Sequence, residues 1–131
     1  MNSYHDYHVY GYEIDSVERV LRIKLAWPNQ NKEADLVHLT FSGVQGYELT
    51  NDSMTSIILS FEEMPLNEFL TEYGDNIKES YRQNGAYGSW ANNLEQAIVT
   101  LNRNNAKAYV LSSSIGMEGW VIAGDVDAKN S

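Results

Sequence analysis

Apolar and polar residues alternate with a period of two through most of the first half of the chain. From residue 21 to residue 27 every second residue is apolar, and the basic residues Arg22 and Lys24 stand between them. Alternation of this kind is typical of a strand that buries one face. A tight connection at Asp15-Ser16 is expected to join the first two strands as a hairpin, and five strands are expected to form an antiparallel meander. The expected strands are 4–14, 19–27, 36–42, 47–49 and 56–62.

The pattern changes to a helical period after Pro65, a residue suited to the first position of a helix. Apolar residues then recur every three or four positions. Gly74 and its two polar neighbours are expected to break or kink this first helix. A second helix is expected to begin near Asn92, with Glu95 as its capping-box partner, and to end at Asn104.

Two further strands, expected at 107–113 and 119–124, form a C-terminal hairpin joined through Gly116. Strands, helices and strands thus follow one another in blocks rather than in strict alternation. This order predicts an α+β fold in which the helices pack on the sheet as one layer. A chain of 131 residues is long enough for one hydrophobic core and short for two. We therefore expect a single α+β domain over residues 1–131.

The charge of the chain narrows the classes of partner. It has 18 acidic against 9 basic side chains, and its formal net charge is −9. This sign argues against nucleic acid, whose phosphates are neutralised by basic side chains, and it suits a basic protein partner or simply solubility. The first residues lack the basic and apolar regions of a secretory signal, and no apolar stretch reaches the roughly 20 residues of a membrane span. We expect a cytoplasmic protein that does not bind membranes.

The sequence offers few groups for catalysis or for cofactors. It has no cysteine, which excludes disulfides, thiol nucleophiles and thiolate metal sites. His5 and His8 are three residues apart and would point to opposite faces of a strand, so they could not easily share a metal ion. Neither a nucleophile elbow nor a phosphate-binding glycine motif is present. We expect no metal, no cofactor and no enzymatic activity.

One group of residues leaves a catalytic or small-molecule-binding alternative open. Glu62 and Glu63 stand where a strand gives way to a helix, and Glu63 is expected to point toward the apolar side with Phe61. His38 is expected on the more exposed face of its strand. If Glu62 or Glu63 converged with His38 in a pocket, the domain could bind a small molecule or catalyse hydrolysis. At a helix start the two carboxylates would otherwise interact with the helix dipole.

Negative charge is concentrated between Glu62 and Arg82, a segment with six acidic and two basic residues. Such a segment is either an ordinary solvated helix face or a docking surface for a cationic partner. The following loop carries Tyr87 and Trp90, which we expect to be exposed and to act as anchors in an interface. Four carboxylates of the segment recur every three or four positions and would form one ridge on a helix: Glu68, Glu72, Asp75 and Glu79.

Three segments carry a further signal: Leu39-Thr40-Phe41-Ser42-Gly43-Val44, 57–63 and 112–123. Together they resemble small uncharacterised bacterial domains, some of which accompany polymorphic or contact-dependent toxins as immunity proteins. The resemblance implies a compact protein that binds and neutralises a cognate toxin without catalysis. We therefore expect a non-enzymatic acidic protein-binding module, specifically an immunity-type inhibitor of a basic toxin such as a nuclease. A structural homodimer or larger homo-oligomer, joined through an edge strand of the meander, is the remaining alternative.

Overall fold

The computed structural model describes residues 4–27, 36–51, 53–85 and 87–130. Within these ranges the fold is α+β, with two α-helices and an antiparallel sheet of eight strands, so the predicted fold class is confirmed. The strand order in the sheet is β4-β7-β6-β5-β1-β2-β3-β8. The elements in chain order are β1 (His8–Asp15), β2 (Val20–Ala26), β3 (Leu36–Ser42), β4 (Gly46–Thr50), β5 (Ile57–Met64), α1 (Leu66–Asn84), the short 3-10 helix η2 (Ser89–Asn92), α2 (Leu94–Arg103), β6 (Lys107–Ile115), β7 (Glu118–Ala123) and β8 (Asp125–Asn130).

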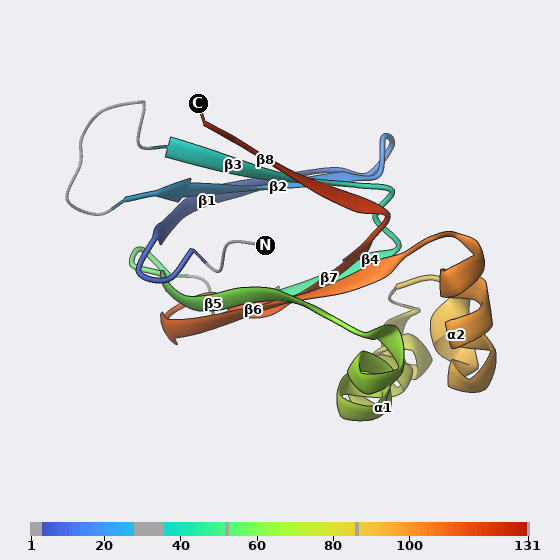
Figure 1. Ribbon diagram of the computed structural model, residues 1–131. Coiled ribbons are helices and arrows are strands. Elements are labelled where there is room, and N and C mark those ends of the chain that lie inside the picture. The colour runs from blue at the N-terminus through green and yellow to red at the C-terminus, as the bar shows by residue number, and fades with distance from the viewer. Residues whose placement is uncertain (1–3, 28–35, 52, 86, 131) are drawn as a thin grey trace.

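The sheet folds over into two facing layers (Figure 1). One layer contains β1, β2, β3 and β8, and the other contains β5, β6, β7 and β4. The chain passes between the layers at two corners that lie side by side, where the backbone N–H of Gly124 donates to the carbonyl oxygen of Ser42 over 2.9 Å. The layers also meet between β1 and β5, where His8 pairs with Ile57 and the N–H of Ile58 donates to the carbonyl oxygen of Tyr7 over 2.9 Å.

The strand pairing follows the predicted five-strand meander through β3 and departs from it after that strand. The consecutive strands β1, β2 and β3 pair as expected. The segment 43–46 then carries the chain into the other layer instead of into a hairpin, so β4 pairs with β7, from Gly46 with Ile122 to Thr50 with Glu118. The sequence did not predict β8, because few of its side chains are apolar. Among the described strands, the two at the edges of the sheet are therefore β4 and β8.

Both predicted hairpins form. Asp15 Oδ1 accepts hydrogen bonds from two backbone N–H groups of the turn between β1 and β2, at 3.1 and 3.0 Å, and these bonds fix the turn. At the C-terminal hairpin β6 and β7 pair directly. The first strand starts at His8 rather than at Tyr4, because the residues before it form a turn in which the N–H of Tyr7 donates to the carbonyl of Tyr4 over 3.0 Å.

An apolar core fills the space between the two layers. At its centre lie the rings of Phe41, Phe61 and Tyr109, each at most 2% exposed, with centroid separations between 5.5 and 6.0 Å. The alternation predicted for the second and third strands is confirmed, because every second residue of β2 and β3 points into this core. These residues are Leu21, Ile23, Leu25, Val37, Leu39 and Phe41.

The two helices cover the outer face of the layer that contains β6 and β7 (Figure 1). Phe69 and Ile77 of α1 and Leu101 of α2 are buried in one cluster with Trp120 and Ile122 of β7. The apolar stripe expected from the sequence is therefore the stripe that packs on the sheet. This second core packs the helix layer on the sheet.

Gly74 does not break the first helix. α1 runs continuously for 19 residues, so the predicted break is wrong. Gly74 is buried, and a Cβ at this position would lie 2.9 Å from Leu94 Cδ1 at the start of α2. The glycine therefore permits a close approach between the two helices.

The second helix is capped by Asn93 rather than Asn92. The Asn93 side-chain oxygen accepts hydrogen bonds from the N–H groups of Glu95 and Gln96, at 3.1 and 3.4 Å. Glu95 is then too close to the cap to complete a capping box, so that prediction is wrong. The predicted end at Asn104 is confirmed, since α2 ends at Arg103 with Asn104 as its C-cap.

Candidate functional site

The four predicted ridge carboxylates lie on the exposed side of α1. The buried residues of this helix, which include Phe69 and Ile77, face the sheet. At 3.6 residues per turn, the four carboxylates fall on the opposite side. The structure therefore brings them together on one face, and we call this surface the acidic ridge. It consists of Glu68, Glu72, Asp75 and Glu79, all of them exposed.

Little of the ridge's charge is neutralised within the described part of the chain. Glu79 forms an ion pair with Arg82, with 2.9 Å between Oε2 and Nη2, and it accepts a hydrogen bond from Gln83. Among the residues that the structure describes, the other three ridge carboxylates form no ion pair. The ridge thus presents uncompensated negative charge to solvent from a well-packed helix.

Tyr87 ties the loop after α1 to the sheet. Its hydroxyl donates a hydrogen bond to Glu48 Oε2 of β4 over 2.5 Å, and it also interacts with Ser80 of α1. Burial, reinforced by the bond to Glu48, raises the pKa of Tyr87 to about 12. The side chain is only half-buried, so part of it remains accessible to a partner or ligand.

Trp90 is not exposed, and this prediction is wrong. The residue is 9% exposed and packs in the cluster between the helices and β7. Its Nε1 donates a hydrogen bond to the carbonyl oxygen of Gln45 over 3.0 Å. The indole therefore holds the corner between β3 and β4 against the helix layer, and it does not offer a protruding anchor to a partner.

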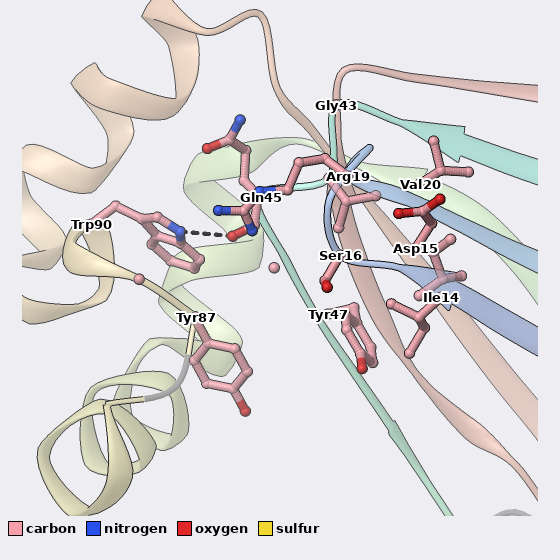
Figure 2. A pocket seen from close by; sticks show the side chains of 14 residues that line it. Ile14, Asp15, Ser16, Arg19, Val20, Gly43, Gln45, Tyr47, Tyr87 and Trp90 are labelled. Carbon is pink, nitrogen blue, oxygen red and sulfur yellow. Dashed lines mark hydrogen bonds between the residues drawn. The ribbon is translucent and has the colours of Figure 1, made fainter.

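A pocket of about 510 Å³ lies beside the loop that carries Tyr87 (Figure 2). It is lined by three segments that are far apart in the sequence: the turn between β1 and β2, the corner between β3 and β4, and the loop after α1. In Figure 2, Tyr87 and Trp90 stand on one side and Ile14 and Val20 on the other, with Tyr47 of β4 between them. The sequence gives no periodic signal for this pocket, because only the folded chain brings the three segments together.

Among the described residues that line the pocket, Asp15 and Arg19 are charged. Asp15 already accepts the two turn hydrogen bonds between β1 and β2. Arg19 has a left-handed backbone, with φ of 58°, and its carbonyl oxygen accepts the N–H of Val44 over 3.0 Å. Its exposed side chain extends across the pocket toward Gln45 (Figure 2). Within the described ranges, Arg19 forms no ion pair.

The structure does not bring His38 together with Glu62 or Glu63. His38 lies on β3, with its Nε2 3.2 Å from the hydroxyl of Tyr10. The two glutamates lie near the end of β5, and β1 and β2 separate that strand from β3 in the sheet. Both carboxylates are exposed, and none of the three residues lines this pocket or the second pocket, of about 480 Å³, beside His8. The geometry gives no support to an acid–base pair.

The histidines near the N-terminus have structural contacts. His5 Nδ1 lies 2.9 Å from the carbonyl oxygen of Leu59, and His5 Nε2 lies 3.4 Å from Asp6. Across residues 4–27, 36–51, 53–85 and 87–130, no group of three or more His, Asp or Glu side chains is arranged to hold a metal ion. No residues of the described chain therefore stand out as ligands for a metal.

Searches for similar proteins gave no match among protein-family models, curated proteins or solved structures. No helix in the described part of the chain combines the length and the apolar character needed to cross a membrane. The function therefore has to be inferred from the geometry of this chain.

Proposed function

We propose that this protein is a non-enzymatic protein-binding module whose acidic ridge docks on a basic protein partner. The observation that carries the proposal is the ridge on α1, where four carboxylates share the exposed side and three of them form no ion pair within the described chain. The net charge of −9 has the same sign as the ridge. The electrostatic field of the whole molecule would thus attract the same basic partner that the ridge contacts.

The ridge stands on a rigid support. Phe69 and Ile77 anchor α1 to the sheet and are 0% and 1% exposed. Beyond the end of the helix, the hydrogen bond between Tyr87 and Glu48 holds the following loop on β4. A surface fixed in this way loses little conformational freedom when a partner binds, so more of the interaction contributes to affinity. Tyr87 is the part of this loop that could contact the same partner.

The resemblance of three segments to domains that accompany bacterial toxins supports a narrower proposal. We infer that the protein is an immunity-type inhibitor and that its partner is a basic toxin. A nuclease toxin would suit this acidic surface, because a basic surface that binds phosphates also attracts carboxylates. Such an inhibitor would meet its toxin in the cytoplasm, and we place the protein there as part of this proposal.

The two alternative functions have less support. A hydrolytic or ligand-binding site built on His38 with Glu62 or Glu63 would need these side chains to converge, and they lie on separate strands. A homo-oligomer would use the free edge of β4 or β8, where backbone groups could pair with another chain. That alternative stays a prediction, and light scattering of the purified protein would test it.

The proposed function is tested by binding to the proteins that neighbouring genes encode. We expect one of these proteins to be basic, to bind the purified chain, and to lose affinity steeply as the salt concentration rises. We also expect the complex to suppress that protein's toxicity when both are produced in the same cell. If no basic neighbour binds, or if binding is insensitive to salt, the proposal is wrong.

A further inference from the structure

The pocket of about 510 Å³ is a feature that protein binding through the ridge does not use. Its volume falls within the range of roughly 300–1,000 Å³ that small-molecule sites occupy. It is formed where the turn between β1 and β2, the corner between β3 and β4 and the loop after α1 meet, and Leu21, Val44 and Trp90 are the buried residues of its lining.

Aromatic rings form much of its wall. Trp90 is fixed by its hydrogen bond to the chain just before β4, and Tyr87 is fixed by its hydrogen bond to Glu48. The ring centroids of Tyr87 and Trp90 lie 6.4 Å apart, and Tyr87 also packs on Trp120 at 5.2 Å. Tyr47 stands between the two sides of the pocket in Figure 2. Rings held in this way favour a flat apolar group, because little further ordering is needed on binding.

Arg19 is the one basic residue among the described residues that line the pocket. The acidic residue there, Asp15, already accepts two backbone hydrogen bonds in its turn. A guanidinium group without an ion pair binds a carboxylate through two parallel hydrogen bonds. The pocket therefore combines aromatic walls with one group that recognises a carboxylate.

The backbone around the pocket is held in conformations that side chains rarely adopt. Arg19 and Tyr87 have φ values of 58° and 73°, both in the left-handed region. Such conformations persist only where the surrounding structure enforces them, and they are concentrated at binding sites. In this chain they position the cationic group and one aromatic wall of the same pocket.

We propose that this pocket binds a small aromatic carboxylate, with the ring between Tyr47, Tyr87 and Trp90 and the carboxylate on Arg19. Two sources could supply this chemistry: a free aromatic acid, or the C-terminal aromatic residue of a peptide. The proposal involves no covalent step. It does not depend on the acidic ridge, which lies on α1, so either proposal can fail without the other.

The test uses the full chain, isotope-labelled for NMR, with hydrocinnamate, its neutral amide and a tetrapeptide that ends in phenylalanine with a free carboxylate. We expect saturable shifts of the amide signals of Gly43, Gly46 and Gly88 with both acids and none with the neutral amide. Tighter binding of the peptide would identify a peptide terminus as the source, and tighter binding of hydrocinnamate would identify a free acid. If neither acid gives saturable shifts, or if the neutral amide binds as well, the proposal is overturned.

Two matched variants test whether the carboxylate of the ligand binds to Arg19. Arg19→Gln keeps a non-glycine residue at the left-handed position, and we expect it to weaken hydrocinnamate binding at least tenfold. Arg22→Gln changes an arginine that pairs with Glu13 over 2.6 Å outside the pocket, and it should leave the affinity unchanged. The same spectra show whether each variant is folded. Equal affinities of wild type and Arg19→Gln would overturn the assignment.

Discussion

Tyr87 donates a 2.5 Å hydrogen bond to Glu48, a residue 39 positions earlier in the chain. This contact holds the loop after α1 on β4, one of the two free edges of the sheet. The same loop forms a wall of the pocket and follows the helix that carries the acidic ridge. Tyr87 therefore fixes the loop that forms one wall of the pocket, and this loop begins where the helix that carries the acidic ridge ends.

Removing the Tyr87 hydroxyl should destabilise the protein measurably. We expect Tyr87→Phe to lower the free energy of unfolding by about 1 kcal/mol, because the half-buried Glu48 carboxylate loses its donor. Urea denaturation gives the value. Tyr10→Phe is the matched control, since the Tyr10 hydroxyl meets His38 on an exposed face. Equal losses in the two variants would contradict the anchoring role of Tyr87.

Gly119 should tolerate no side chain. Its φ is 154°, and a Cβ at this position would overlap the carbonyl oxygen of Glu48 on the neighbouring strand. We expect Gly119→Ala to cost more than about 2 kcal/mol, because backbone strain adds to the loss of pairing between β4 and β7. Gly85→Ala is the control. Gly85 has φ of 70° with open space around it, so we expect about 1 kcal/mol from strain alone. Thermal unfolding that ranks the two variants in the reverse order would refute this interpretation.

The structure has Asn93 as the N-cap of α2, whereas the sequence predicts a helix start near Asn92. Asn93→Ala should lower the free energy of unfolding by about 1 kcal/mol, because the N–H groups of Glu95 and Gln96 lose their acceptor. Asn92→Ala should have a smaller effect, since Asn92 is exposed and ends η2. Circular dichroism during urea unfolding measures both. A larger loss of stability in Asn92→Ala than in Asn93→Ala would instead support Asn92 as the N-cap, as the sequence predicts.

Stability should fall at alkaline pH. Burial, with a smaller effect from the Glu63 and Asp125 charges, raises the pKa of Tyr109 from 10.0 to about 12, and the pKa of Tyr87 is raised to about 12 as well. Between pH 10 and 12 the unfolded chain loses these protons while the folded chain keeps them, so the free energy of unfolding decreases as the pH rises. Below pH 10 the two hydroxyls contribute no such dependence.

A substitution at Tyr109 tests how much of this loss of stability at alkaline pH comes from its hydroxyl. In Tyr109→Phe the group that titrates is gone, and we expect the decrease between pH 10 and 12 to become smaller than in the wild type. Urea unfolding at several pH values within this window measures it, and lysine titration contributes to both proteins alike. Identical slopes would show that the Tyr109 pKa is not raised in the folded protein.

Local periodicity was enough to predict much of the fold. The alternation around Ile23 and Leu39 identified strands with one buried face, and the apolar stripe through Phe69 identified the packed side of α1. Strand pairing could not be predicted in the same way. β4 pairs with β7 because the corner after Ser42 changes layer, and that choice depends on contacts between segments far apart in sequence.

The candidate sites likewise differ in whether local periodicity could predict them. The acidic ridge could be predicted, because the helical period alone places Glu68 and Asp75 on one face. The burial of Trp90 could not, since the glycine-rich loop around it resembles an exposed loop and its partner, the carbonyl of Gln45, is remote in the chain. The pocket around Arg19 was missed for the same reason, as its walls come from three separate segments.

The affinity of two matched double variants for the basic partner tests the central claim most directly. Glu68→Lys with Glu72→Lys reverses two ridge carboxylates, and Glu18→Lys with Asp127→Lys reverses two exposed carboxylates outside the acidic segment, so both variants have the same net charge. Titration calorimetry should show the ridge variant binding at least tenfold more weakly than the matched variant. Equal affinities of the two variants would contradict binding through the acidic ridge.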